Sequence, residues 1–179
     1  MRIISGKYKG KRLNAPKNLP ARPTTDLAKE ALFNILNNRY YFEDLSVLDL
    51  FAGIGSISFE FASRGAKEVI SVDKHFNSVQ FVRKTAKALN LAINALKSDV
   101  YSFLDKTTIK FDIIFADPPY EFSREQFEAI IATVFDKNLL NDEGLLIIEH
   151  SKRTDLSENS YFSQSKKYGG SSFSFFEKE

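Results

Sequence analysis

The sequence predicts an α/β domain whose mostly parallel sheet is covered by helices on both faces. Short, continuous apolar runs of the kind found in buried strands alternate along the chain with segments of helical periodicity. The chain has 179 residues, of which 43% are hydrophobic, and this is enough for one domain with a sizeable core. Because the chain contains no internal repeat and no low-complexity segment, a single alternating α/β unit is favoured.

The first 22 residues differ from the rest and are expected to form a basic hairpin or arm ahead of a main domain at 23–179. Residues 2–5 and 11–14 have the composition of two short strands, and glycines bracket the reversal between them. Prolines at three positions after residue 15 then keep the chain extended and prevent a helix from starting.

The main domain is expected to open with a helix and then to alternate strands and helices. The helix begins near Thr25 or Asp26, either of which can cap its first turn. The run 47–50 is a strand of buried type, and the glycine-containing stretch 51–55 leads into a helix at 56–63. One face of the opening helix carries Ala28, Leu32, Ile35 and Leu36.

Two further strand–helix pairs follow. The apolar run 69–72 predicts a strand, and apolar residues three or four positions apart between 79 and 89 predict a helix with one buried face. A weak strand at 95–96 leads to a short helix after Asp99.

The last part of the chain completes the sheet. The run 111–115 predicts a strand, and 124–135 predicts a helix. A glycine precedes the strand at 145–148, and a pair of glycines separates two β-like segments at 161–164 and 171–176.

The composition excludes several kinds of site. The chain has no cysteine, which rules out disulfides, thiolate zinc sites, iron–sulfur clusters and a cysteine nucleophile. Its two histidines belong to no motif, so no metal site is expected and both are assigned structural or surface roles. No run approaches the ~18–20 apolar residues of a membrane span, and the N-terminus lacks a secretory signal. We therefore expect a cytoplasmic protein that does not contact a membrane.

Positive charge is concentrated in residues 1–25, which contain seven Lys and Arg residues and no acid. The rest of the chain carries more acids than bases, so a basic arm precedes a mildly acidic body. This distribution is typical of a protein with an anionic partner, usually a nucleic acid, although a solvated surface strand would look the same. The candidate RNA-binding residues of the arm are Lys7, Lys9, Lys11 and Arg12.

Acidic residues fall at or just past the expected ends of four strands, namely Asp49, Asp73, Asp99 and Asp117. In a doubly wound sheet, ligands bind at the carboxyl ends of the strands, near the switch in strand order. Gly53 and Gly55 follow the first of these acids, and glycine lets a backbone approach a ligand closely. An acid in the position of Asp73 can hold the two hydroxyls of an adenosine ribose.

The residues around the glycines distinguish between nucleotide ligands. A dinucleotide-binding fingerprint needs a third glycine where this chain has Ser58, and no phosphate-cradling Gly-Lys-Ser/Thr sequence is present. Asp49 would repel a pyrophosphate but suits a cation. S-adenosylmethionine (SAM) carries a sulfonium, an ammonium and a ribose but no phosphate, so SAM is predicted as the cofactor and S-adenosylhomocysteine as its product.

The sequence Asp117-Pro118-Pro119-Tyr120 is the most specific motif in the chain. The lone pair of an exocyclic base amine is delocalised into the ring, so a methylating site must aim that lone pair at the methyl carbon. The Asp117 carboxylate and the Pro118 carbonyl can each accept one N–H, and the prolines stiffen the loop. Tyr120 can stack on the base, which contributes roughly 1–3 kcal/mol in such sites. The alternative interpretation is a stiff turn with Asp117 as a cap.

These motifs, in this order, resemble the class I SAM-dependent amino methyltransferases, and more closely the RsmD family of bacterial 16S rRNA guanine-N2 methyltransferases. The matching segments are Arg2 to Gly10, Arg22 to Asp26, Lys29 to Leu36, Leu48 to Gly55, Val72 to Lys74, Ile114 to Tyr120 and Lys167 to Gly169. The first three segments are specific to that family, and the next three occur in many methyltransferases.

The resemblance implies a Rossmann-like class I methyltransferase fold with seven strands, the last of them antiparallel. It also implies which residues bind each ligand. Asp117 to Tyr120 would hold the target guanine, and the segment with Arg22 and Thr24 would border the cofactor and the RNA. Asp73 would bind the ribose of SAM, and Asp99 with Val100 would flank its adenine. The methionine part of SAM would be contacted by Asp49, Phe51, Gly53 and Gly55.

The implied activity is methyl transfer from SAM to N2 of a guanine in 16S rRNA, within the small ribosomal subunit or an assembly intermediate, by a monomer that needs no metal. An adenine-N6 methyltransferase of RNA or DNA can use the same motif, although this chain has no room for a DNA-reading domain. A non-catalytic RNA-binding module on the same fold is the alternative of a different class. A protein-glutamine methyltransferase would more often have Asn at position 117, and Ser58 disfavours a dehydrogenase.

Overall fold

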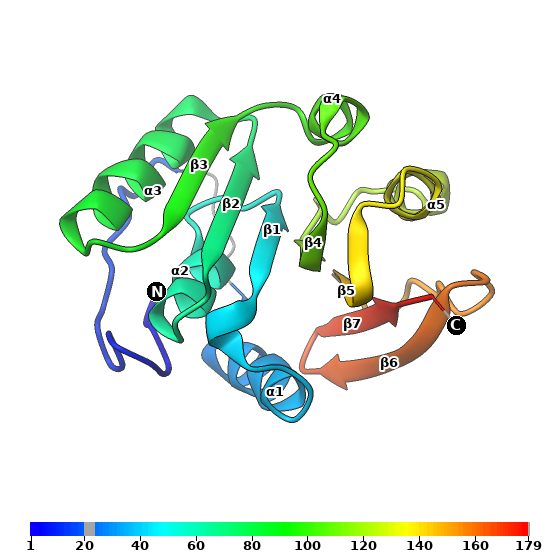
Figure 1. Cartoon of the computed structure of the whole chain (residues 1–179), viewed down its shortest axis with the longest axis horizontal. Coiled ribbons are helices and arrows are strands. Elements are labelled where there is room, and N and C mark those ends of the chain that lie inside the picture. The colour runs from blue at the N-terminus through cyan, green and yellow to red at the C-terminus, as the bar shows by residue number, and fades with distance from the viewer. Residues whose placement is uncertain (20–23, 179) are drawn as a thin grey trace.

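A seven-stranded sheet forms the centre of the computed structural model, which describes residues 1–19 and 24–178 (Figure 1). The strands lie in the order β3-β2-β1-β4-β5-β7-β6. Neighbours from β3 to β5 are parallel, whereas β7 is antiparallel to both β5 and β6, so the predicted sheet with an antiparallel last strand is confirmed. The strands are β1 (Ser46–Leu50), β2 (Glu68–Asp73), β3 (Ile93–Lys97), β4 (Phe111–Ala116), β5 (Leu140–Ser151), β6 (Phe162–Tyr168) and β7 (Ser171–Phe176).

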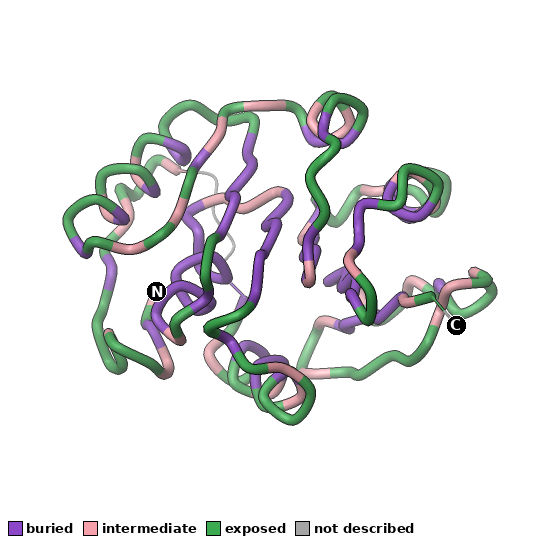
Figure 2. The backbone as a smooth tube through the Cα atoms, in the orientation of Figure 1, coloured by how far each residue is buried: buried purple, intermediate pink, exposed green. Residues whose placement is uncertain are grey.

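Helices cover both faces of the sheet, as predicted. In the described part of the chain, α1 and α2 pack with one set of strand side chains, and α4 and α5 pack with the set that points the other way. Five strands, β1, β2, β4, β5 and β7, are buried along most of their length, whereas β6 at the edge is largely exposed (Figure 2). No helix among these residues is long and apolar enough to cross a membrane. The helices are α1 (Asp26–Asn37), α2 (Ser56–Ser63), α3 (Phe76–Ala88), α4 (Val100–Lys106), α5 (Arg124–Asp136) and a short 3-10 helix, Phe42–Asp44.

The switch in strand order lies between β1 and β4. From β1 the chain proceeds outward to β2 and β3, and it then crosses to β4 on the other side of β1. Parallel strands end at the same edge of the sheet, so the loops after β1, β2, β3 and β4 gather there. The strand predicted at 145–148 is longer in the structure, because a bulge opposite Phe111 and Ile113 lets β5 begin at Leu140.

The N-terminal reversal contains one antiparallel bridge, Arg2–Arg12, so the prediction of two regular strands was wrong. The N–H groups of Ile4 and Ser5 do not pair across the reversal but donate to the Glu60 carboxylate on α2, at 2.9 and 3.0 Å. The ladder ends after one bridge, because the Gly10 N–H donates to the Ile3 carbonyl and the Lys11 N–H donates to the Tyr8 carbonyl. The segment is nevertheless anchored, because the side chains of Ile3 and Leu13 are buried beside α2 and α3. The predicted division at residues 22 and 23 falls outside the described residues and stays a prediction.

A buried ion pair joins α1 to α2 beneath this segment. Lys29 and Glu60 are almost completely buried, and their Nζ and Oε2 atoms are 3.7 Å apart. Lys29 also donates to the carbonyl oxygen of Arg2 at 2.6 Å and to the Ser56 hydroxyl at 3.3 Å. Burial lowers the pKa of Lys29, and Glu60 opposes that shift. The pair thus connects the N-terminal reversal to the start of α2, which is also the edge of the functional site.

Gly6 permits the closest approach in this region. Its φ is +82°, and a Cβ atom there would lie 1.9 Å from the carbonyl oxygen of Ser63. The neighbouring Lys7 N–H donates to that same oxygen at 2.7 Å. Any side chain at position 6 would therefore separate the reversal from α2.

Candidate functional site

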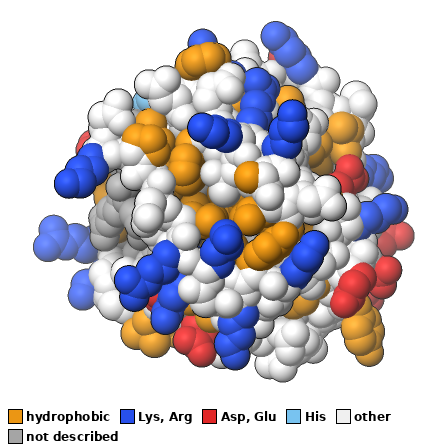
Figure 3. Space-filling model, turned by 90° about the vertical axis from the view of Figure 1, so that its left-hand side faces the viewer, with side chains coloured by type: hydrophobic (Ala, Val, Ile, Leu, Met, Phe, Trp, Pro, Cys, Tyr) orange, Lys and Arg blue, Asp and Glu red, His pale blue; other side chains and the backbone are white. Residues whose placement is uncertain are grey.

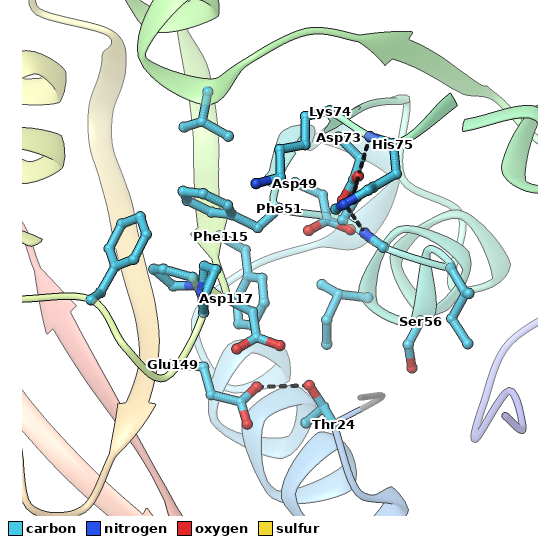
Figure 4. Close-up of a pocket in the computed structure, with 18 of the residues that line it drawn as sticks. Thr24, Asp49, Phe51, Ser56, Asp73, Lys74, His75, Phe115, Asp117 and Glu149 are labelled. Carbon is cyan, nitrogen blue, oxygen red and sulfur yellow. Dashed lines mark hydrogen bonds and ion pairs between the residues drawn. The ribbon is translucent and has the colours of Figure 1, made fainter. Parts of the chain in front are cut away.

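A cavity of about 460 Å³ lies at the carboxyl ends of β1, β2 and β4, at the switch in strand order. This is the place where doubly wound sheets bind ligands. Nearly all of the predicted cofactor and base residues line it, with Gly55 as the exception (Figure 4). The predicted residues that line it are Thr24, Asp49, Phe51, Gly53, Asp73, Asp99, Val100, Asp117, Pro118, Pro119 and Tyr120.

Asp49 contributes a buried carboxylate to the floor of the cavity. It lies on β1 and is 2% exposed, and its Oδ2 accepts hydrogen bonds from the Ser58 N–H at 3.0 Å and the Ser58 hydroxyl at 2.5 Å. Burial raises the pKa of Asp49 to about 7, and the Ser58 hydrogen bonds oppose that rise. A cationic ligand would stabilise the charged form of Asp49, so the predicted contact with a cation stays a prediction that this environment suits.

Asp73 fixes the shape of the glycine loop from the end of β2. Its Oδ2 accepts the Gly53 N–H at 2.8 Å, and its Oδ1 accepts the His75 N–H at 2.8 Å and contacts His75 Nδ1 at 2.9 Å. Figure 4 shows these contacts on the side of the cavity opposite Glu149. His75 lines the cavity as well, a role that the sequence did not predict because the histidine stands in no motif.

Gly55 serves the turn rather than the cavity. It is the N-cap of α2 with φ +78°, and a Cβ atom there would lie 3.0 Å from the Val82 side chain and 3.1 Å from the ring of Phe59. Gly55 is not among the residues that line the cavity, so a direct contact with the cofactor is not supported. Its place in the motif reflects the left-handed turn and the close packing of α2 against α3.

Asp99 and Val100 lie at the far end of the cavity, where β3 leads into α4. Asp99 is exposed and caps α4, because its carboxylate accepts the Ser102 N–H at 3.0 Å. Val100 is buried and presents an apolar surface. The Asp99 carboxylate suits the amine of an adenine, and the Val100 side chain suits the face of its ring. Asp99 caps α4 as well.

The Asp-Pro-Pro-Tyr segment follows β4 and forms the opposite wall. The Asp117 N–H donates to the Leu50 carbonyl at 3.3 Å, which continues the pairing of β4 with β1. Pro118 is buried, whereas Tyr120 is 47% exposed. The turn closes with the Phe122 N–H bonded to the Pro119 carbonyl, and the ring of Phe122 packs edge-on against Phe51 at 5.4 Å. The glycine loop after β1 and the Asp-Pro-Pro-Tyr loop after β4 therefore pack against each other through these two rings.

Thr24 and Glu149 meet at the base end of the cavity. The Thr24 hydroxyl donates to Glu149 Oε2 at 2.7 Å, and both side chains are buried. They are 125 positions apart in the chain, so no local sequence pattern reveals the contact. Glu149 was absent from the predicted site, and Thr24 lies in the cavity rather than on an open surface. Arg22, which was predicted to contact RNA, lies outside the described residues.

The predicted RNA-binding cations Lys7, Lys9, Lys11 and Arg12 are exposed, but none of them lines the cavity. Tyr8 at this tip donates its hydroxyl to the Leu89 carbonyl just after α3, and Lys7 and Lys11 lie over its ring. The neighbouring segment 74–98 carries five Lys and Arg residues and no acid. Figure 3 views the molecule from this side, and Lys and Arg side chains are scattered across the face.

The sequence is similar to those of proteins named as rRNA methyltransferases, in agreement with the residues that line the cavity. The family described as conserved hypothetical protein 95 matches residues 1–177. A putative rRNA methyltransferase, YlbH of Bacillus subtilis, is 36% identical over 163 residues, which cover 88% of this chain and 86% of that protein. Ribosomal RNA small subunit methyltransferase D of Escherichia coli is 36% identical over 153 residues, which cover 83% of this chain and 74% of the relative.

Solved structures are similar along nearly the whole chain. The putative methyltransferase yhhF of Escherichia coli has a TM-score of 0.83 at 29% identity and covers 98% of this chain and 96% of its own. The Thermus thermophilus 16S rRNA N2 G1207 methyltransferase RsmC, in complex with AdoMet and guanosine, has a TM-score of 0.70 at 27% identity. The match to RsmC covers 90% of this chain and 45% of that one.

Proposed function

Because the chain belongs to the conserved hypothetical protein 95 family, as an RsmD-type methyltransferase, we propose that it methylates N2 of a guanine in small-subunit rRNA with SAM as the methyl donor. The observation that carries the proposal is the position of Asp117-Pro118-Pro119-Tyr120. The motif lines the same cavity as the glycine loop and the Asp49 and Asp73 carboxylates.

The cavity fits SAM in size and in chemistry. Small-molecule sites commonly enclose ~300–1,000 Å³, and this one measures about 460 Å³. Asp49 offers a negative charge to the cationic methionine part, Asp73 offers oxygen atoms to the ribose, and Val100 offers an apolar wall to the adenine. When bound, SAM supplies an electrophilic methyl group, and no metal ion is required for that chemistry.

The base end of the cavity holds and orients the amine. The Asp117 carboxylate and the Pro118 carbonyl accept its two N–H bonds and so direct its lone pair. As N2 becomes positively charged, the Asp117 carboxylate stabilises that charge. Tyr120 is half exposed at the mouth, where it can stack on a base that has left its helix.

We further propose that the basic face holds the RNA. The N-terminal reversal and α3 place Lys7, Lys9, Lys11 and Arg12 beside the acid-free segment 74–98, and this segment begins at the cavity with Lys74. Such a surface can contact the phosphates of an RNA that extends from the cavity along α3 and the N-terminal reversal. An enzyme with this substrate acts in the cytoplasm, as a monomer, on the small subunit or on an assembly intermediate.

The experiment is a substrate panel with isotopically labelled SAM. Small ribosomal subunits, naked 16S rRNA, DNA and a protein extract are each incubated with the protein, and incorporation of the label is measured. Incorporation into small subunits or 16S rRNA supports the proposal. Incorporation into DNA or protein alone would overturn it, and the absence of incorporation from every substrate would favour a non-catalytic module.

A further inference from the structure

Glu149 is a buried carboxylate at the base end of the site, outside the Asp-Pro-Pro-Tyr motif and outside the segments that resemble the family. It lies on β5 and is 6% exposed. The last pair in the ladder between β4 and β5 is Ala116 with Ile148, so Asp117 and Glu149 follow at the same level on adjacent strands. Both residues line the large cavity and a small cleft beside it. Figure 4 shows their carboxylates next to each other.

A hydroxyl holds the Glu149 carboxylate in this place. Thr24 donates to its Oε2 at 2.7 Å, and Thr24 itself is buried at the start of α1. An ionised carboxylate has about four acceptor positions, so a carboxylate held in this way can accept a further bond from a ligand.

The edge of guanine beside N2 matches this set of acceptors. It offers N1–H and the two N–H bonds of the N2 amine, which are three donors in one plane. The site offers the Asp117 carboxylate, the Pro118 carbonyl and the Glu149 carboxylate. Adenine and cytosine present an unprotonated ring nitrogen next to their amines, and that nitrogen would face a carboxylate with no proton between them.

We propose that Glu149 determines the choice of base, by accepting the N1–H of the guanine whose N2 amine is held by Asp117. This inference rests on the proposed function and adds to it. Sites built to bond a polar group can reject an analogue that lacks it by a factor of ~10⁴–10⁵. The Asp-Pro-Pro-Tyr motif alone does not separate guanine from adenine, whereas a carboxylate beside it does.

The test uses the rRNA segment that the wild-type protein methylates, synthesised with either guanine or 2-aminopurine at the methylated position. 2-Aminopurine keeps the N2 amine but lacks N1–H. The wild-type protein is expected to lose at least about 100-fold in kcat/KM on 2-aminopurine. Glu149→Gln supplies an amide N–H to the bare N1, so the ratio of kcat/KM on guanine to that on 2-aminopurine should fall at least about tenfold.

Glu143→Gln makes the same chemical change at the exposed start of β5 and should leave the ratio as in the wild type. Circular dichroism and SAM affinity show whether Glu149→Gln is folded. If Glu149→Gln does not fold, equal wild-type rates on the two bases would still overturn the inference. A folded Glu149→Gln protein with the wild-type ratio would also overturn it. If the wild-type protein methylates no guanine at all, the proposed function itself fails.

Discussion

Asp117 is the residue on which the proposed chemistry depends. Asp117→Asn keeps the shape of the side chain but removes the charge that stabilises a positive N2. We expect kcat to fall ~10²–10³-fold, the usual cost of one lost electrostatic contact, while the dissociation constant of SAM changes little. Single-turnover methylation and calorimetry measure the two quantities. A fully active Asp117→Asn protein would show that the charge of Asp117 does not contribute to methyl transfer.

Asp73 has two tasks that substitutions can separate. Asp73→Ala removes the acceptor for two ribose hydroxyls, and it also removes the acceptor for the Gly53 N–H. Hydrogen bonds to charged groups contribute ~1.5–3 kcal/mol each, so SAM affinity should fall at least about tenfold. Asp73→Asn retains an acceptor for the loop and should lose less. Calorimetry that gave equal affinity for Asp73→Ala and the wild type would place the ribose elsewhere.

The buried Asp49 makes cofactor binding depend on pH. Its pKa is raised to about 7, so the carboxylate is mostly charged at pH 8 and mostly neutral at pH 6. A cationic ligand needs the charged form, and the apparent affinity for SAM should therefore fall about tenfold from pH 8 to pH 6. Fluorescence or calorimetric titrations in matched buffers measure this change. Asp49→Asn is the control, because any titration of SAM itself is common to both proteins.

Binding that is equally tight for the wild type at pH 6 and pH 8 would show that Asp49 does not contact the cation. A slope shared by the wild type and Asp49→Asn would point to the ligand instead. His75 contacts Asp73, so His75→Gln is measured alongside.

At the scale of elements, the N-terminal reversal and α3 form the basic face. Replacing Lys7, Lys9, Lys11 and Arg12 with alanine should weaken binding to small subunits and flatten its salt dependence. Each lost phosphate contact lowers the slope of log K against log salt by roughly 0.7–0.9. SAM affinity should not change, because the tip of the reversal contacts the C-terminal half of α2 and the end of α3.

A matched control removes four exposed lysines, Lys106, Lys110, Lys137 and Lys178, from other elements. If both quadruple variants show the same salt slope as the wild type, the basic reversal is a surface feature and the RNA binds elsewhere. The pair Lys84 and Lys87 on α3 was missed by the sequence analysis, because neither lysine belongs to a basic run with the first segment. Their replacement should act in the same direction.

The helices and strands were predictable where a local pattern determines them. Apolar runs with aspartates at their ends placed Asp49, Asp73 and Asp117 at one edge of a parallel sheet, and the structure brings all three to one cavity. The two regular strands predicted for the opening hairpin are absent from the described residues, and the N–H groups of Ile4 and Ser5 donate to Glu60 instead. That contact joins residues more than 50 positions apart.

At the scale of the whole molecule, the missed parts of the site come from distant segments. Thr24 meets Glu149 across 125 positions, and the buried Lys29 joins α1, α2 and the N-terminal reversal. From a single sequence, a buried lysine on a helix cannot be distinguished from an exposed one. The sheet order determines such meetings, since it places β5 beside β4 and thus Glu149 beside Asp117.

The most direct measurement of the central claim is the identity of the methylated nucleoside. Small subunits from cells that lack this protein are incubated with the purified protein and SAM, and their 16S rRNA is digested and analysed by mass spectrometry against nucleoside standards. We predict a gain of 2-methylguanosine at a single position, and no gain with Asp117→Asn. A gain of 6-methyladenosine instead, or no methylated nucleoside in the rRNA, would contradict the account.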